Sequence, residues 1–149
     1  MVRRADRRLH CGGKEFFAEL TEALCAAIRL HVRYDTNDEH GETRRERNER
    51  YHTPSPEIEI PPGANHFWEW YFELANGISR VSDGVCYPAN WSEFFAWSQV
   101  METPLKSWEF EILRAMDIAF CAETNIEFEA YRERQKEKAK QNAPSKGKR

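Results

Sequence analysis

One acidic residue, Asp117, lies inside the apolar stretch SWEFEILRAMDIAF, residues 107–120. A carboxylate there could act as a general acid, a metal ligand or a structural group. A helical wheel of about 100° per residue gathers the apolar residues on one face and places Asp117 just outside it. Arg114 lies one turn earlier, within reach of an ion pair. The position therefore predicts a boundary carboxylate that pairs with Arg80 or Arg114, or caps a neighbouring helix.

Catalysis by Asp117 would need a second chemical group aimed at the same cleft. Glu109 and Glu123 project to other parts of the wheel, and His66 lies in a different segment. The chain has no glycine-rich phosphate loop, no His-Glu-x-x-His motif, and no Ser or Cys in a nucleophile motif. We therefore expect no enzymatic activity and no catalytic residue, and we assign structural roles to Asp117 and Arg114.

Cysteine and histidine residues are too scattered to suggest a metal site. Cys11 follows His10 directly, but a zinc site would need two more ligands presented by a helix or a turn. The four cysteines include no C-x-x-C pair, so neither a disulfide framework nor a zinc ribbon is indicated. We expect no metal and no cofactor. The thiols and imidazoles concerned are Cys11, Cys25, Cys86, Cys121, His10, His31, His40, His52 and His66.

Composition points to one modest folded domain with polar flanks. The chain has 149 residues, of which 13% are aromatic, so part of it must fold around large rings. The net charge of −3 gives no global attraction to nucleic acid or to an anionic membrane. No apolar segment follows the basic N-terminus, and no run approaches the length of a membrane span. We expect a soluble protein that is not exported.

The pattern along the chain predicts four segments. Apolar residues recur at three- and four-residue spacing between Lys14 and His31, which places an amphipathic helix within residues 1–33. Residues 34–63 are polar, with prolines at their end, and are predicted to form a flexible linker. Residues 64–134 are expected to form the main helical domain, and residues 135–149 a disordered charged tail.

Three helices are expected in the main domain. The first begins near Asn65 and carries aromatic rings over a broad arc. The second begins after Asn90, and Glu93 stands three residues later in capping-box spacing, which assigns Glu93 a structural role. The third begins near Ser107. Because no β-alternation is evident, we predict an all-α fold: a small three-helix aromatic-rich domain with an additional N-terminal helix, a flexible linker and a flexible tail.

Aromatic, proline, arginine and acidic residues follow a distinctive order in HFWEWYFELANGISR, the Pro-Ala-Asn link and WSEFFAWSQVMETPLKSWEFEILRAMDIAF. This order, over residues 64–122, resembles the tail assembly chaperone family of long-tailed bacteriophages and prophages. That family has a Trp-rich helix ending in Arg, a Pro-containing link, a W-x-E-x-x-A-W type helix, a Pro and a W-E-x-x-x-L-x-x-M-D helix. The matching positions are Trp68, Trp70, Leu74, Arg80, Pro88, Trp91, Glu93, Ala96, Trp97, Pro104, Trp108, Glu109, Leu113, Met116 and Asp117.

The resemblance implies a non-enzymatic protein of the bacterial host cytoplasm. Such chaperones coat the tape measure protein before the tail tube polymerises around it, and they are not retained in the mature virion. The tail tube protein and a second copy of the chain are further candidate partners, and the chain could be a frameshift fusion. Rings in excess of a small core would form an apolar groove for a partner helix. The partner-binding residues that we predict are Trp68, Trp70, Arg80, Trp91, Trp97 and Trp108.

An alternative function relies on the arginine-rich segments. A small regulatory or nucleic-acid-associated helical protein would contact phosphates through Arg44, Arg45 and Arg47. However, the arginines of this segment alternate with glutamates, a pattern typical of a solvated segment rather than a phosphate-binding strip. A salt-dependent shift in nucleic-acid mobility that is lost on replacing these arginines would favour this alternative.

Overall fold

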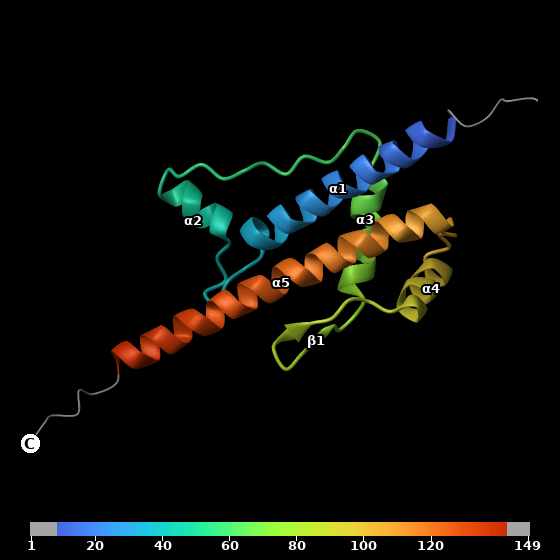
Figure 1. Ribbon diagram of the computed structural model, residues 1–149. Helices are drawn as coiled ribbons and strands as arrows, with labels where there is room; N and C mark the ends of the chain where they lie inside the picture. The colour runs from blue at the N-terminus through green and yellow to red at the C-terminus, as the bar shows by residue number, and fades with distance from the viewer. Residues whose placement is uncertain (1–8, 143–149) are drawn as a thin grey trace, which may run out of the picture.

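The computed structural model describes residues 9–142, which form a mostly helical fold with one small sheet. The long helices α1 and α5 run side by side and in the same direction, and α3 crosses them (Figure 1). Helix α4 lies beside the first turns of α5 (Figure 1). The elements are α1 (Leu9–Asp35), α2 (Arg44–Arg50), α3 (Asn65–Asn76), β1 (Val81–Ser82), β2 (Val85–Cys86), α4 (Trp91–Val100) and α5 (Ser107–Gln141).

Helix α1 shares one hydrophobic core with α3, α4 and α5. Leu24 and Ile28 lie one turn apart on α1 and are fully buried, as are Leu113 and Met116 of α5. The predicted amphipathic helix is therefore present, but it completes the core instead of lying beside a separate three-helix domain. The reason is physical: its apolar stripe needs a partner surface, and α5 offers one along much of its length.

A β-hairpin interrupts the helical pattern, so the prediction of a purely α fold was wrong. Strands β1 and β2 pair antiparallel, with Val81 opposite Cys86 and Ser82 opposite Val85. Asp83 and Gly84 form the turn with φ of 53° and 73°, and a type I′ turn requires positive φ at both of these positions. Strands of two residues are too short to show alternation, and the Asp-Gly pair was the one available signal.

The segment predicted as a flexible linker contains the short helix α2. Thr43 caps this helix, and Glu46 completes a capping box with it. Arg45 of α2 bonds to Asp35 at the end of α1, and Arg44 bonds to Glu127 of α5. The alternating charges that suggested a solvated segment thus hold α2 against both long helices.

Helix α5 continues further than the predicted domain boundary. It runs to Gln141, so residues 135–141 of the predicted tail are helical. Residues 143–149, the rest of that tail, lie outside the described residues. Within residues 9–142, no helix is both long enough and apolar enough to cross a membrane.

Truncating a buried side chain of α1 tests whether this helix belongs to the folded unit. We expect Ile28→Ala to lower the free energy of unfolding by about 2–5 kcal/mol, because Ile28 is fully buried and its removal leaves a cavity. Phe16→Ala is the matched control on the same helix, since Phe16 is 60% exposed; its effect should stay within about 1 kcal/mol. Chemical denaturation followed by tryptophan fluorescence gives both values. Equally small losses of unfolding free energy in both variants would contradict the conclusion that α1 shares the core.

Candidate partner-binding surface

A buried carboxylate joins three parts of the chain. Asp117 of α5 is fully buried, and its Oδ1 accepts hydrogen bonds from the Arg80 guanidinium and, at 3.1 Å, from the Tyr71 hydroxyl. Its Oδ2 accepts a 2.7 Å hydrogen bond from the backbone N–H of Ala89. Tyr71 belongs to α3, while Arg80 and Ala89 flank the hairpin. We call these four residues the Asp117 cluster.

Asp117 was expected at the boundary of the apolar face, but it is fully buried. The helical wheel considers α5 alone, whereas the hairpin and its flanking residues cover the edge of α5 where Asp117 lies. Of the two predicted ion-pair partners, Arg80 is the one that binds. Arg114 is exposed and instead places its guanidinium over the ring of Trp91, with 6.0 Å between Cζ and the ring centroid.

Electrostatics within the cluster favour the protonated forms of Tyr71 and Arg80 beside the carboxylate. Burial, followed by the negative charge of Asp117, raises the pKa of Tyr71, so its hydroxyl stays protonated and donates to the carboxylate. The Arg80 side chain is only 8% exposed, and its guanidinium also lies over the ring of Phe120. Arg80, predicted as a partner-binding residue, therefore faces the interior, where it balances the buried charge of Asp117.

The cluster also determines where α4 begins. Ala89 is followed by Asn90, the N-cap of α4, whose side-chain Oδ1 accepts a 3.0 Å hydrogen bond from the Glu93 N–H. In return, a carboxylate oxygen of Glu93 accepts a 2.7 Å hydrogen bond from the Asn90 N–H, which completes the capping box. The backbone that enters α4 is thus held on α5 by Asp117 one residue before the cap.

The five predicted partner-binding tryptophans fall into two groups. Trp97 is 9% exposed, and Trp68, Trp70 and Trp108 are half-buried; all four pack on rings of α1, α3 or α4. Trp91, in contrast, is 66% exposed at the start of α4. The structure therefore places four of the tryptophans in or against the core and presents one to solvent.

Trp91 borders an apolar groove between α4 and the start of α5. Its ring lies 4.6 Å from that of Phe110, and Phe95, one turn further along α4, is as exposed as Trp91. The groove has a volume of about 300 Å³. We call it the α4 groove; its lining residues are Trp91, Phe94, Phe95, Ser98, Gln99, Pro104, Leu105 and Phe110.

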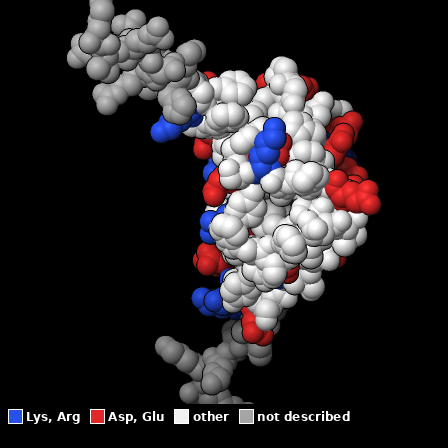
Figure 2. All heavy atoms as spheres, turned by 90° about the vertical axis from the view of Figure 1, so that its right-hand side faces the viewer, with Lys and Arg blue, Asp and Glu red and all other residues white. Residues whose placement is uncertain are grey.

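Apolar exposure extends beyond the groove across this end of the molecule. Val100 and Met101 are exposed at the end of α4, and Phe16 and Phe17 are exposed on α1, where Phe17 packs on Trp108. Figure 2 shows this end of the molecule as mainly uncharged, with most acidic and basic groups toward its edges. Exposed apolar side chains gathered at one end of a molecule are typical of an interaction site.

Sequence reasoning missed Phe95 and Phe110 as members of this surface. The signal that could have indicated them is the spacing of Trp91, Phe95 and Gln99, which recur every four residues along one exposed stripe of α4. The short helix is aromatic on both sides, so its sequence alone does not say which side faces the core.

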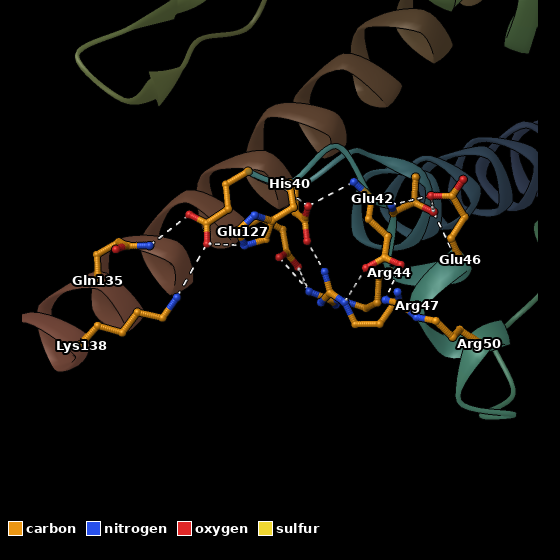
Figure 3. A network of polar contacts seen from close by, with 12 residues as sticks. His40, Glu42, Arg44, Glu46, Arg47, Arg50, Glu127, Gln135 and Lys138 are labelled. Carbon is orange, nitrogen blue, oxygen red and sulfur yellow. Dashed lines mark hydrogen bonds and ion pairs between the residues drawn. The ribbon is translucent and has the colours of Figure 1, made fainter. Parts of the chain in front are cut away.

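A larger pocket of about 850 Å³ lies between the segment after α1, α2 and the second half of α5. Its charged rim is internally paired: Arg44 bonds to Glu127 at 2.9 Å, and Arg47 bonds to Asp38 (Figure 3). Lys138 lies 3.8 Å from Glu39 in the same network (Figure 3). These pairs join α2, the segment after α1 and α5 to one another, and each of the three cations in them already has a carboxylate partner.

Among the side chains that the structure describes, residues 13–142, no group of three or more His, Cys, Asp and Glu residues is suited to a metal ion. Two of the cysteines predicted to be scattered, Cys86 and Cys121, are in contact in the folded chain. The apolar α4 groove, placed by the Asp117 cluster, is accordingly the surface that we consider for function.

Comparison with known proteins gives one family match. Residues 42–122 match a sequence-family model described as phage tail assembly chaperone. The matched range covers more than half of the chain and contains both the Asp117 cluster and the α4 groove. It begins two residues before α2, whereas the resemblance in the sequence covers residues 64–122. No curated protein and no solved structure matches the chain.

Removing the carboxylate tests the structural role of the Asp117 cluster. We expect Asp117→Ala to lower the free energy of unfolding by about 3–5 kcal/mol, because the buried Arg80 loses its counter-charge and two further donors lose their acceptor. Glu111→Ala removes an exposed carboxylate from the same helix and should change stability by about 0.5 kcal/mol or less.

A double-mutant cycle with Arg80→Met isolates the ion pair from the other effects. The two substitutions together should cost at least about 1 kcal/mol less than the sum of the single costs, because the second change removes a charge that the first left unpaired. Urea denaturation supplies the four free energies. Strictly additive costs would show that Arg80 and Asp117 do not interact.

Proposed function

This chain belongs to the phage tail assembly chaperone family, and on that premise we propose that it binds the tape measure protein through the α4 groove during tail morphogenesis. The observation that carries the proposal is the exposure of Trp91 and Phe95 on a helix whose start is anchored by a buried charge. An exposed aromatic surface on a folded support is suited to binding a partner.

The chemistry of the groove suits a partner helix with an apolar stripe. Tryptophan and phenylalanine bury large areas at low conformational entropy cost, and tryptophan is enriched among the residues that dominate binding energy. A helix presents apolar residues at three- and four-residue spacing, which is the pattern that a groove between α4 and the start of α5 can accept. A tape measure protein, as a long helical chain, would offer many such stripes.

The proposed activity is binding and shielding rather than catalysis. A chain that covers apolar stripes of the tape measure protein would keep it from aggregating until the tube protein replaces the chaperone. Release at that stage would leave the chaperone in the host cytoplasm and outside the mature virion. Moderate affinity suits this role, since each copy must leave as the tube grows.

Ion pairing of the arginines works against the nucleic-acid alternative. Arg44 bonds to Glu127, Arg45 to Asp35, and Arg47 to Asp38 and Glu42. Phosphate contacts by these side chains would first have to break bonds to carboxylates, with loss of the attachment of α2. The groove could instead bind the tail tube protein or a second copy of this chain. Measuring the binding of each of these proteins separately distinguishes these roles from the proposed one.

Replacing the two exposed rings of α4 should weaken binding to the partner. We expect Trp91→Ser combined with Phe95→Ser to weaken binding to the tape measure protein at least tenfold, because each buried ring contributes on the order of 1–2 kcal/mol. Isothermal titration calorimetry with the tape measure protein or its soluble fragments measures the effect. Separate titrations with the tail tube protein and with the chaperone itself measure binding to the two alternative partners.

Tyr51→Ser is the matched control, because Tyr51 is an exposed ring, 69% accessible, at the end of α2. It should leave affinity unchanged. Wild-type affinity in the groove variant, with its thermal unfolding also unchanged, would sink the proposal. So would a wild-type chain that binds only tube protein or itself.

A further inference from the structure

Two buried thiols lie in contact between the hairpin and the long helix. Cys86 of β2 and Cys121 of α5 are each 2% exposed, and their Sγ atoms are 3.3 Å apart. A disulfide bond has an S–S length of about 2.05 Å, so the sulfur atoms would need to approach by about 1.2 Å. The two sulfur atoms are therefore already in contact, without any residue between them.

Asn125 keeps Cys86 in this position. Its side-chain Oδ1 accepts a 2.7 Å hydrogen bond from the Cys86 N–H, and its Nδ2 donates to the Cys86 carbonyl oxygen at 3.0 Å. Asn125 lies one helical turn after Cys121, on the same side of α5. The contact between the thiols therefore rests on a two-point attachment of the backbone, in addition to the packing of the side chains.

We propose that Cys86 and Cys121 are a site of reversible disulfide formation, driven by a peroxide, that locks the hairpin onto α5. The Cys86 sulfur attacks one peroxide oxygen, the O–O bond breaks, and a sulfenic acid and one water form. The Cys121 sulfur then attacks the sulfenic sulfur, the S–O bond breaks, and the departing hydroxide takes the Cys121 proton as a second water. Two thiols and one hydrogen peroxide thus yield one disulfide and two waters.

The surroundings make this a slow reaction. Burial, followed by the hydrogen bond with Cys86, raises the pKa of Cys121 to about 12, so its thiolate is scarce at neutral pH. The peroxide must also reach Cys86 past the hairpin, whose two-residue strands are too short to be stable alone and can open locally. Both thiols accordingly stay reduced in a reducing cytoplasm and react under sustained oxidation.

The bond would enclose the part of the chain that carries the candidate surface. The segment between Cys86 and Cys121 contains Ala89, all of α4 and the start of α5. Closing a loop of this length lowers the entropy of the unfolded chain. The disulfide would add a covalent link beside the Asp117 cluster, whose Arg80 also donates a 3.6 Å hydrogen bond to the Cys121 sulfur. The proposed link does not depend on which partner the α4 groove binds.

Oxidation of the full chain tests the proposal directly. The protein is treated with hydrogen peroxide, blocked with an alkylating reagent under denaturing conditions, and digested for mass spectrometry. We expect a linked pair of peptides that contain Cys86 and Cys121, and a rise in Tm of roughly 10 °C that dithiothreitol reverses. Cys25→Ala, which removes another buried thiol, should keep both effects, whereas Cys86→Ala should lose both.

Other outcomes overturn the proposal. Links from Cys86 or Cys121 only to Cys11 or Cys25, sulfinic or sulfonic acid in place of the linked peptides, or an unchanged Tm in the linked protein would each do so. If Cys86→Ala fails to fold, the linked peptides and the Tm of the wild-type and Cys25→Ala proteins still decide.

Discussion

Burial of the Asp117 carboxylate is the constraint on which the arrangement of the other elements depends. A charge with no exposed surface is costly unless several donors surround it, and here the donors come from α3, from the residue before the hairpin and from the residue before the α4 cap. The chain can satisfy Asp117 only when all of these segments are folded together. The position of α4, and with it the α4 groove, follows from the hydrogen bond to Ala89.

Aromatic residues divide between two tasks in so small a protein. Trp70, Trp97 and Trp108 fill space between helices, where a core of limited volume gains most from large rings. Trp91 and Phe95 remain exposed on α4. The ring of Phe110 packs against both Trp91 and the buried Phe94. The buried rings make the support rigid, and the exposed rings supply a surface that, in the function proposed here, a tape measure helix would cover.

The sequence was sufficient for features that depend on neighbouring residues and insufficient for those that depend on the assembled fold. Helices α3, α4 and α5 and the pairing of Asn90 with Glu93 could be anticipated from spacing alone, and the family could be anticipated from a resemblance in the order of aromatic, proline, arginine and acidic residues. The burial of Asp117 could not be anticipated, because a helical wheel of α5 alone does not include the hairpin that covers this residue. Helix α2 was missed because ion pairs with α1 and α5, and no apolar stripe, hold it in place.

Hydrogen–deuterium exchange of the full chain, with and without the tape measure protein, tests the central claim most directly. The claim is that α4 and the start of α5 form the binding surface, presented by a body that is already folded. We predict that the partner slows exchange in residues 91–110 and leaves α2 and the residues around the 850 Å³ pocket unchanged. Protection confined to α2 and that pocket, with residues 91–110 unaffected, would contradict the account.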